Sequence, residues 1–566
     1  MNIEKSDYLR IALLGALFTL CACSMWAFPT QASLYHVAVN GQDLTSCQKG
    51  TNPQTPRQSI GGSLRCLSPG DTLYVHSGTY GESILSWKTK IPNGKGWDKP
   101  ITVAVYPGDV VTITPRKGHA FFWINDGQAK YLIIDGFIID GENQALHGFK
   151  FHENTRYVRI QNTEVKNSTA SGILVTPGPG RVQDTYHEFI NMKVHHNGQS
   201  RLDHGFYVTT SSNLFEKNEV FLHQGYGIHI YQSKENTANN NVIRHNIVHN
   251  NGLAGWSCGI LLSSGEGNIA HNNIVYENFI GLCSQYRSTN AQFYNNIAYE
   301  NRISGIYVGD KTNSQTGVYN NTIYKNGTQG IFIGDGARKA QVKNNIVYLN
   351  GAHNIFEQEK GKNEASVSHN LMIDPRFVNA QAHDFRLQPG SPAIGGGIFI
   401  DGITLDNKAI TKQTGEPPDI GAFAYHSIET AQKQNPKALA DIGQRGSILP
   451  QVSVPADKPT LVSPPAGSIL SGSTETFSWS TVPAAQEYFL QIGTGLGQPN
   501  EPLTKNIFNA TVPASQDSVV VHQLPTNGMP LYVRFWYKQD NQWIANEQVL
   551  FRAGSSPMGN LPNGPR

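Results

Sequence analysis

The sequence predicts an all-β protein: a single-stranded right-handed parallel β-helix, which is a solenoid of short strands, followed by a small antiparallel β-sandwich. Three observations predict this fold. A glycine followed by an apolar, a variable and an apolar residue recurs through the middle of the chain. An asparagine-led segment alternates with it, and a strand-like alternation replaces both near the C-terminus. The 56 glycines exceed ordinary usage, and 39% hydrophobic residues suffice for a core.

Residues 1–32 predict an export signal. Two basic residues precede the apolar run 11–20, which is too short to span a bilayer as a stable helix. Residues 20–23 are similar to a lipobox, in which Cys23 would be lipidated, whereas residues 30–32 are similar to an ordinary signal-peptidase site. An uncleaved membrane anchor is the third alternative. Because no later stretch is apolar enough to span, the mature protein is expected to be periplasmic, extracellular or an outer-membrane lipoprotein.

The glycine-led repeat has spacings of 22 to 25 residues at its regular end, and the asparagine-led series lies between its copies. A single coil cannot bury its own inward face, but stacked coils bury a continuous core. We expect about ten coils between residues 70 and 375, with the asparagines forming a ladder inside the turns. The two series are Gly148, Gly172, Gly205, Gly227, Gly259, Gly281, Gly305 and Gly330, and Asn162, Asn191, Asn218, Asn246, Asn273, Asn296, Asn321 and Asn345.

These repeats and the segments at both ends of them resemble the bacterial right-handed β-helix repeat proteins of the pectate-lyase-like superfamily. The resemblance extends over residues 34–425 and implies the fold. It implies no single activity, because the superfamily holds lyases, hydrolases, epimerases and proteins of no known activity. The segments that carry it are residues 35–41 and 68–80 at the start, and 374–378, 385–394 and 418–423 at the end.

The chain after the signal is expected to divide into four parts. Residues 33–426 form the β-helix with its N-terminal cap, and residues 427–457, rich in Lys, Gln, Pro and Ala, form a linker. Residues 458–553 contain about seven alternating strands and resemble a fibronectin-III or immunoglobulin-like module. Residues 554–566 are expected to be disordered.

The residue in the middle of each glycine-led strand is expected to face outward, because its two apolar neighbours must face the core. Adjacent rungs of a parallel sheet lie about 4.8 Å apart, so Tyr207 and His229 should be neighbours on this face. Ile228 and Ile230 should be buried, whereas His229→Ala should cost little stability. The outward row contains Lys150, Leu174, Tyr207, His229, Leu261, Cys283, Tyr307 and Phe332.

The longest coils lie beside the same two residues. From glycine to the next asparagine, Gly172 and Gly227 lead coils of 19 residues, whereas most coils take 13 to 16. Loops added beside one polar stretch are how solenoids build a binding groove. The titratable residues that these loops add are Arg181, Asp184, His195, His196, Arg201, Asp203 and His204.

These residue types suit β-elimination on a uronate chain, which needs a base for the proton α to the carboxylate, a cation for the resulting charge and an acid for the leaving oxygen. His229 is the predicted base, Tyr207 the acid, and Arg181 or Arg201 the carboxylate partner. His204 is a further catalytic candidate, or else a turn residue bonded to the backbone. Hydrolysis needs two carboxylates across the bond, and the outward positions supply none. The predicted substrate contacts are Lys150, Arg181, His195 and His196.

Cysteine and charge patterns limit cofactors and partners. Cys47 and Cys66 flank a Gly/Pro/Ser-rich loop and are expected to pair in an oxidising compartment. Cys258 and Cys283 occupy different repeat positions, so pairing is less expected there. Calcium is possible at Asp184 or Asp203, although no calcium loop is recognisable. A net charge of +2 gives no field toward nucleic acid, and a monomer is expected.

The predicted function is therefore that of a secreted polysaccharide-active protein, with a lyase acting on an acidic glycan as the preferred activity. One alternative is a surface protein that binds glycan or mediates adhesion without catalysis. A second is a uronate epimerase, which uses the same proton abstraction. The sequence leaves open which glycan is bound and whether the protein is an enzyme.

Overall fold

The structure is a computed structural model, and the predicted Cys23 lipidation site, linker and C-terminal tail lie outside the residues that it describes. The chain divides into two compact units, Met1–Ile373 with Gly396–Ala422, and Asp374–Gly395 with Phe423–Arg566. No helix in the described part of the chain is long and apolar enough to cross a membrane. The described residues are 32–44, 46–125, 129–152, 155–177, 185–232, 238–309, 312–358, 363–403, 417–425, 461–464, 470, 472–479, 485–495, 504–526, 530–539 and 542–552.

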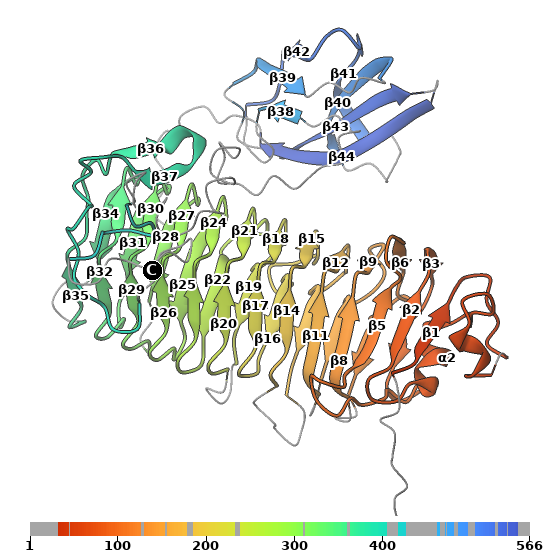
Figure 1. Cartoon of the computed structure of the whole chain (residues 1–566). Helices are drawn as coiled ribbons and strands as arrows, with labels where there is room; N and C mark the ends of the chain where they lie inside the picture. Colours follow the sequence, from red (N-terminus) through yellow and green to blue (C-terminus); the bar gives the residue numbers. More distant parts are fainter. Residues whose placement is uncertain are drawn as a thin grey trace, which may run out of the picture. The chain divides into compact units, whose positions relative to one another are not determined.

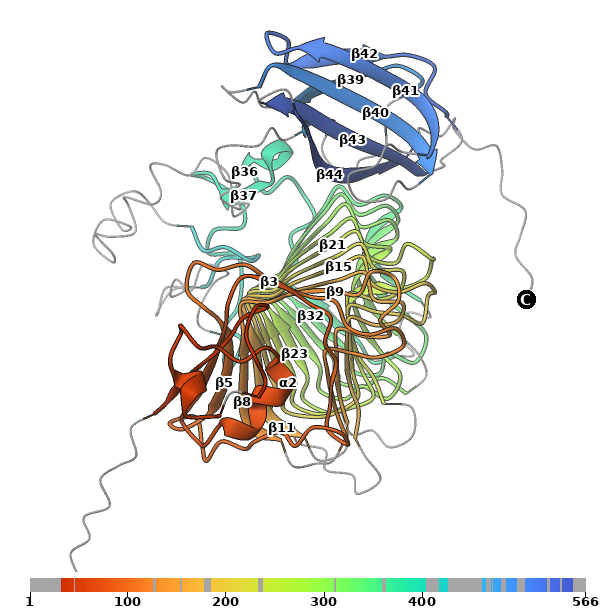
Figure 2. The same ribbon diagram turned by 90° about the vertical axis from the view of Figure 1, so that its right-hand side faces the viewer.

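The first unit is a right-handed parallel β-helix built from three sheets, here called A, B and C, each of which runs straight from coil to coil (Figure 1). Sheet A has 13 strands and sheets B and C have 11 each. Figure 2 views the solenoid down its axis and shows the three sheets arranged around its interior. The predicted fold class is confirmed.

The strand bounds follow the order of the sheets. Sheet A contains β1 (Leu34–Val37), β2 (Thr72–Val75), β5 (Ile101–Val105), β8 (Lys130–Asp135), β11 (Arg156–Gln161), β14 (Glu188–Ile190), β17 (Leu214–Glu216), β20 (Val242–Arg244), β23 (Ile269–His271), β26 (Gln292–Tyr294), β29 (Gly317–Tyr319), β32 (Gln341–Lys343) and β35 (Ser366–Ser368). Sheet B contains β3 (Gly78–Tyr80), β6 (Val111–Ile113), β9 (Ile138–Asp140), β12 (Glu164–Lys166), β15 (Lys193–His195), β18 (Glu219–Phe221), β21 (Ile247–His249), β24 (Ile274–Tyr276), β27 (Ile297–Tyr299), β30 (Thr322–Tyr324) and β33 (Ile346–Tyr348). Sheet C contains β4 (Ile84–Leu85), β7 (Phe122–Ile124), β10 (Phe149–Phe151), β13 (Ile173–Val175), β16 (Phe206–Val208), β19 (Ile228–Ile230), β22 (Cys258–Ser263), β25 (Ile280–Gln285), β28 (Ser304–Val308), β31 (Gln329–Ile333) and β34 (His353–Glu357).

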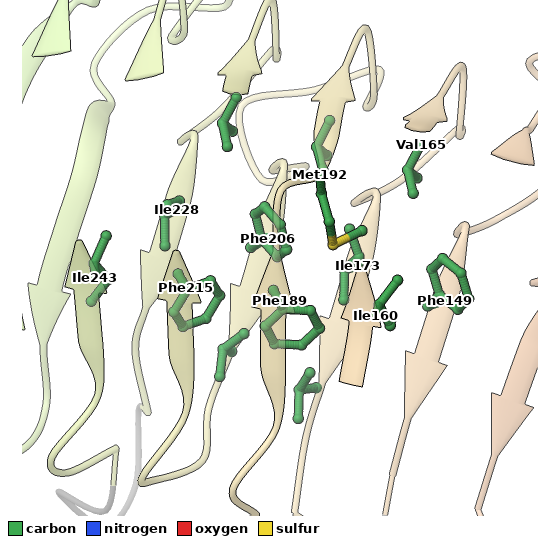
Figure 3. Packing of buried hydrophobic residues seen from close by; sticks show 14 of the residues in the cluster. Phe149, Ile160, Val165, Ile173, Phe189, Met192, Phe206, Phe215, Ile228 and Ile243 are labelled. Carbon is green, nitrogen blue, oxygen red and sulfur yellow. The ribbon is translucent and has the colours of Figure 1, made fainter. Parts of the chain in front are cut away.

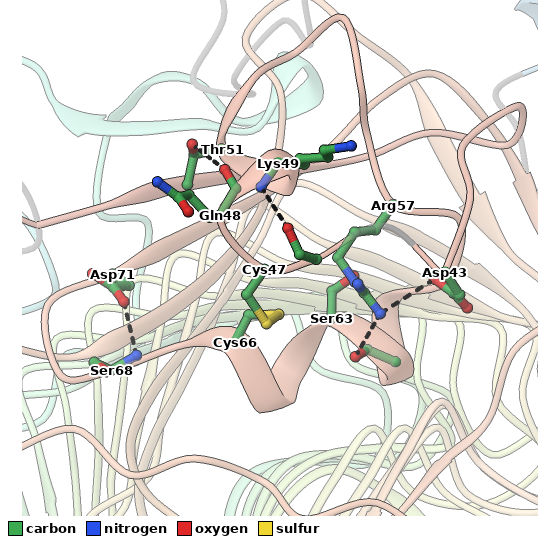
Figure 4. The surroundings of a disulfide bond; sticks show 12 residues. Asp43, Cys47, Gln48, Lys49, Thr51, Arg57, Ser63, Cys66, Ser68 and Asp71 are labelled. Atoms are coloured by element: carbon green, nitrogen blue, oxygen red, sulfur yellow. Dashed lines mark hydrogen bonds and ion pairs between the residues drawn. A yellow bond between two sulfur atoms is a disulfide. The ribbon is translucent and has the colours of Figure 1, made fainter.

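Three short helices, η1 (Lys49–Thr51), α2 (Ile60–Ser63) and η2 (Leu64–Cys66), precede β2 and cap the first coil. Ile60 and Leu64 are fully buried and belong to the same hydrophobic core as the sheets. A disulfide joins Cys47 to Cys66 across this cap (Figure 4). The cap therefore covers the open N-terminal end of the solenoid core.

The predicted row of glycines at the entry to sheet C is confirmed, and close backbone approach explains it. A Cβ atom added to Gly205 would lie 2.6 Å from the carbonyl oxygen of Gly227, and one added to Gly227 would lie 2.6 Å from that of Gly259. No real Cβ tolerates such a contact, so only glycine fits where consecutive coils meet here.

The core contains the apolar residues that follow these glycines together with those of sheets A and B. Phe206 packs against Phe189 and Phe215 with ring centroids 5.3 Å apart in both cases (Figure 3). Ile228 and Ile230 are fully buried, as the repeat predicts. The strands are only a few residues long, so this stacking of inward side chains is what stabilises them.

The asparagine ladder exists, with one correction to its register. From Asn218 to Asn370, each side-chain Nδ2 donates to Oδ1 of the asparagine in the next coil at 2.8 to 3.0 Å. Asn162 and Asn191, predicted to be members, instead occupy the preceding left-handed position, with φ of 51°. The left-handed position favours asparagine because asparagine tolerates a positive φ. The left-handed position and the ladder position therefore look alike in the sequence.

Two further ladders were not predicted. Asn251, Asn278, Asn301, Asn326 and Asn350 are linked in the same way at the turn from sheet B to sheet C. Asn213, Asn241 and Asn268 form a shorter ladder at the turn from sheet C to sheet A. In the coils that carry these ladders, asparagine side chains of the neighbouring coil therefore satisfy buried backbone N–H groups of the turns.

Ile230→Ala is expected to lower the free energy of unfolding by about 2–5 kcal/mol, because Ile230 is fully buried in the core. The matched control is Ile274→Ala, which removes the same atoms from a half-buried position on the outer side of β24. Urea unfolding of both variants measures the difference. An equal loss in the two would contradict the inward facing of Ile230.

The second unit is antiparallel. A hairpin of β36 (Phe377–Asn379) and β37 (Asp384–Leu387) flanks η3 (Ala380–Ala382). The remaining strands form a three-stranded and a four-stranded sheet that share one core, in which Phe477, Trp479 and Tyr488 are buried. The predicted small antiparallel region is confirmed. The two sheets are β38 (Leu461–Ser463), β39 (Glu475–Trp479) and β42 (Ser518–Val521), and β41 (Thr504–Pro513), β40 (Glu487–Gly495), β43 (Pro530–Gln539) and β44 (Gln542–Arg552).

Candidate functional site

Tyr207 and His229 are adjacent in the register of sheet C, on strands β16 and β19. Their rings are stacked, with centroids 5.0 Å apart and planes inclined by 12°. Both side chains point away from the core, since the apolar residues on either side of each are fully buried. The outward row predicted from the repeat therefore brings these two residues together.

Three further rings surround His229. Tyr226 stacks on it at 4.3 Å, Tyr231 at 5.3 Å, and His204 meets it edge-on at 4.3 Å. These five residues are called the His229 cluster below. Tyr226 and Tyr231 were not among the predicted site residues, although they lie at the two ends of the segment Tyr-Gly-Ile-His-Ile-Tyr over residues 226–231.

The rings leave only 8% of His229 exposed. The expected small stability cost of removing the His229 side chain assumed that this side chain is exposed to solvent. That assumption is wrong, because the side chain faces outward but is covered by the surrounding rings. Aromatic residues next to the glycine-led triplet close over the row, and an alternation of inward and outward positions cannot predict this covering.

The electrostatics of His229 are unusual. Its Nδ1 is buried and has no hydrogen-bond partner among the described residues. Burial, with a smaller contribution from His204, holds the pKa of His229 well below its ordinary value, so the ring is neutral at neutral pH. A buried polar atom without a partner costs about 1–3 kcal/mol, and such an atom in a native fold calls for an explanation.

His204 is bonded to the backbone. Its Nδ1 accepts a hydrogen bond from the Tyr226 N–H at 3.2 Å, which assigns the proton of the neutral ring to Nε2. Burial lowers the pKa of His204 to about 3. His204 therefore positions Tyr226 within the cluster and matches the turn role that was its alternative in the sequence.

The inserted loop that ends at His204 contributes one exposed cation, Arg201. Its charge favours the ionised form of Tyr226, but burial dominates and raises the pKa of Tyr226 to about 12. Asp203 closes the same loop, because its Oδ2 accepts from the N–H groups of Gln199 and Ser200 at 3.1 and 2.8 Å. Arg201 is thus the cation that the inserted loop brings near the His229 cluster, where its charge acts on Tyr226.

Neither predicted calcium ligand is seen in a metal site among the described residues. Asp203 is engaged by its own loop, and Asp184, like Arg181, lies outside the described residues. Across the described ranges, no three His, Cys, Asp or Glu side chains come together in a way that would hold a metal ion.

His195 and His196 have their described contacts on sheet B rather than in the His229 cluster. His195 stacks on Phe221 at 4.8 Å and lies 3.2 Å from Glu164. Burial opposes ionisation of Glu164, but its bonds to His195 and Lys166 hold the pKa at about 2. The two histidines were placed in one group because they begin the inserted loop, yet the chain turns away from sheet B before that loop reaches the cluster.

Lys150 lies in the same outward row, three rungs from His229 and about 14 Å along the axis. Its Nζ lies 3.9 Å over the ring of Trp123, which is its neighbour in the preceding coil. Trp87, which is 49% exposed, packs edge-on against Trp123 at 5.5 Å. The outer face of sheet C therefore continues from the cluster to a cationic and aromatic patch.

Beyond His229 the row is closed by a disulfide. Cys258 and Cys283 are bonded, with their Cα atoms 6.2 Å apart. The expectation against this pair is wrong, because both cysteine side chains lie in one buried cluster with Leu261 and Ile280, although their positions in the repeat differ. Leu261, the partner of His229 in the next coil, packs with this disulfide and with Ile280. Tyr226 of the His229 cluster packs against the same apolar residues.

The comparisons with known proteins concern the fold. The family model described as a right handed beta helix region matches residues 181–347. No curated protein matches the sequence. The matched family model agrees with the right-handed β-helix expected from the repeats.

Among solved structures, the chain is similar to pectate lyase Pel9A at 17% identity and a TM-score of 0.47, covering 70% of this chain and 96% of that one. It is similar to the A-module of the Azotobacter vinelandii mannuronan C-5 epimerase AlgE6 at 16% identity and a TM-score of 0.40, covering 54% and 91%. It is also similar to a rhamnogalacturonan lyase at 13% identity and a TM-score of 0.35, covering 63% and 94%.

Proposed function

We propose that the protein is exported and cleaves an acidic polysaccharide by β-elimination on the outer face of sheet C. One observation carries this proposal: His229, whose imidazole is held neutral by burial, stacks directly on Tyr207 on the outer face of sheet C. A neutral imidazole is the form that accepts a proton, and a hydroxyl beside it is the form that donates one.

The proposed reaction uses three residues. His229 takes the proton from the carbon α to the uronate carboxylate, and Arg201 stabilises the charge that develops on that carboxylate. The electron pair forms a carbon–carbon double bond, the bond to the glycosidic oxygen breaks, and the Tyr207 hydroxyl protonates that oxygen. The proton on His229 then returns to Tyr207 through solvent.

The cluster suits the charge changes of this reaction. The imidazolium formed on His229 is stacked between tyrosine rings, whose faces attract a cation. Burial raises the pKa of Tyr207, so its hydroxyl carries its proton at working pH. Lys150 provides a second cation farther along the row for another carboxylate of the same chain.

Export is supported by the two disulfides, Cys47–Cys66 and Cys258–Cys283, because disulfides persist in oxidising compartments. The export signal predicted in residues 1–32 points to the same compartment. We propose a location outside the cytoplasm, either free or tethered through Cys23.

An absorbance screen across uronate polymers is the first test. Incubation of the full chain with polygalacturonate, alginate and rhamnogalacturonan, with and without calcium, is expected to generate an unsaturated uronate that absorbs in the near ultraviolet on at least one of them. Absence of such a product on all three would remove the lyase reaction.

The covering of His229 favours a second candidate function, in which the same face binds glycan without cleaving it. Binding grooves also need aromatic faces and hydrogen-bond donors. Polymer binding with neither cleavage nor exchange of the α-proton with deuterated solvent would establish this function. Exchange without cleavage would instead indicate a uronate epimerase.

A further inference from the structure

From the coil of β8 onward, each coil has a residue with a left-handed backbone at the same register position, where the chain enters sheet A. In three consecutive coils this residue is a tyrosine: Tyr131, Tyr157 and Tyr186, with φ of 53°, 53° and 49°. The next coils place no aromatic residue there: the position holds Ser212, Asn240, Gly267, Asn290, Gln315, Lys339 and Glu364. Glycine and short polar residues suit this conformation, whereas a bulky ring does not. Three tyrosines in succession therefore indicate a role beyond local structure.

The three rings form a stack along the edge of the solenoid. Tyr131 and Tyr157 have centroids 4.7 Å apart, and Tyr157 and Tyr186 have centroids 5.2 Å apart, with planes within 9°. Trp97 closes the first end of the stack by packing edge-on against Tyr131 at 5.5 Å. At the other end the coil after Tyr186 has Ser212 at this position, so the stack of described rings ends at Tyr186. Tyr186 is 42% exposed, and no ring in the described ranges covers its outer face.

A hollow of about 270 Å³ lies along the same edge, beginning two rungs beyond Tyr186. Its lining includes Asn239, Asn240, Glu266, Asn290 and Gln292. The Glu266 N–H donates to Asn239 Oδ1 at 2.8 Å, and Asn290 Nδ2 donates to Glu266 Oε1 at 3.1 Å, so these side chains are fixed. The side-chain amides of Asn240 and Gln292 have no partner in the part of the chain that the structure describes.

We propose that this edge is a second glycan-binding site, which takes a neutral polysaccharide. The C–H face of a pyranose ring packs on the open face of Tyr186, where a fourth ring of the stack would lie. The following sugar residues extend along the edge, and their hydroxyl groups bond the amides of Asn240 and Gln292. The distance from Tyr186 to Asn240 is two rungs, about 10 Å, which is the scale of a short oligosaccharide.

The charge of the hollow selects the ligand. Glu266 is the one charged residue among the lining residues that the structure describes. A polyuronate would be repelled, unlike on sheet C, where Lys150 and Arg201 are available. The edge site does not depend on the β-elimination proposed above, and it would hold the protein on a neutral matrix while the sheet C face meets an acidic chain.

The test is Tyr186→Asn in the full chain, with titration calorimetry against xylohexaose, cellohexaose and mannohexaose. Asparagine occupies the equivalent position at Asn240 and Asn290 and tolerates the left-handed backbone, so the variant is expected to fold. Wild type is expected to bind at least one of the three oligosaccharides, and Tyr186→Asn is expected to weaken that binding roughly 3- to 10-fold.

Tyr131→Asn is the matched control, because it removes the same ring from a left-handed position where neighbouring rings already flank it. Its affinity is expected to stay within about twofold of wild type, and Gln292→Ala is expected to bind more weakly than wild type. No binding of any of the three oligosaccharides, or equal affinities for wild type and Tyr186→Asn, would overturn the edge site. A loss in Tyr131→Asn as large as in Tyr186→Asn would do the same. Cleavage of a uronate polymer is scored separately in each variant and is expected to be unchanged.

Discussion

His229→Leu is expected to reduce the turnover of the uronate polymer by roughly 10²–10⁴-fold, because it removes the proposed base. The same change is expected to raise the free energy of unfolding. Leucine already occupies this outward row at Leu174 and Leu261, and the substitution removes a buried nitrogen that has no partner. Initial rates at saturating substrate and a thermal melt measure the two effects.

The matched control is His249→Leu. His249 is also an outward histidine between two rings, with Phe221 and Tyr276 each 4.8 Å away. It lies on sheet B, its Nδ1 is bonded to Asn250, and its Nε2 lies 3.5 Å from Glu219 Oε1, so both of its nitrogens have a polar neighbour. Its turnover is expected to equal that of wild type, and its stability is expected to fall. Full turnover in His229→Leu would remove His229 from the reaction, and a less stable His229→Leu would contradict the cost assigned to its buried nitrogen.

Asn273→Ala is expected to destabilise the solenoid by about 2–6 kcal/mol, from two buried groups at roughly 1–3 kcal/mol each. Asn273 Oδ1 accepts from the backbone N–H of Asn246 at 2.9 Å, and its Nδ2 donates to the carbonyl of Ile243 at 2.9 Å. Both groups lie inside the turn, so water cannot replace the lost bonds. Denaturant unfolding measures the change.

Asn370→Ala provides the comparison at the end of the ladder. Asn370 is half-buried and accepts from Asn345 in the same way, but solvent reaches it. The expected loss is below about 1 kcal/mol, the usual net worth of one hydrogen bond. Similar losses at Asn273 and Asn370 would show that burial does not set the value of a ladder position.

The fold could be predicted from the sequence because a solenoid repeats its constraints. The glycine at the entry to sheet C meets the next glycine's backbone in coil after coil, so the same residue recurs at a fixed spacing. Inward positions such as Phe206 and Ile228 recur for the same reason. The ladder register was less certain, because Asn191 and Asn218 are both turn asparagines, although one serves backbone conformation and the other hydrogen bonding.

The candidate site could be predicted only in part. Register alone brought Tyr207 beside His229, because strand alternation and rung spacing fix both positions. The closure of the site depends on Tyr226 and Tyr231, which lie outside the repeating triplet and follow no period. His195 and His196 were assigned by their position in a loop, and only the three-dimensional path of that loop shows that they contact sheet B.

The bond between Cys258 and Cys283 has a mechanical consequence. A solenoid is held together between nearest coils, so a chain pulled from one end would lengthen one coil at a time. The disulfide encloses a separation of 25 residues, which withholds about 85 Å of extended chain from such a pull. Under tension in an oxidising medium, the residues between Cys258 and Cys283 would remain a closed loop and would not extend. That length of chain would become extensible only after the disulfide is reduced.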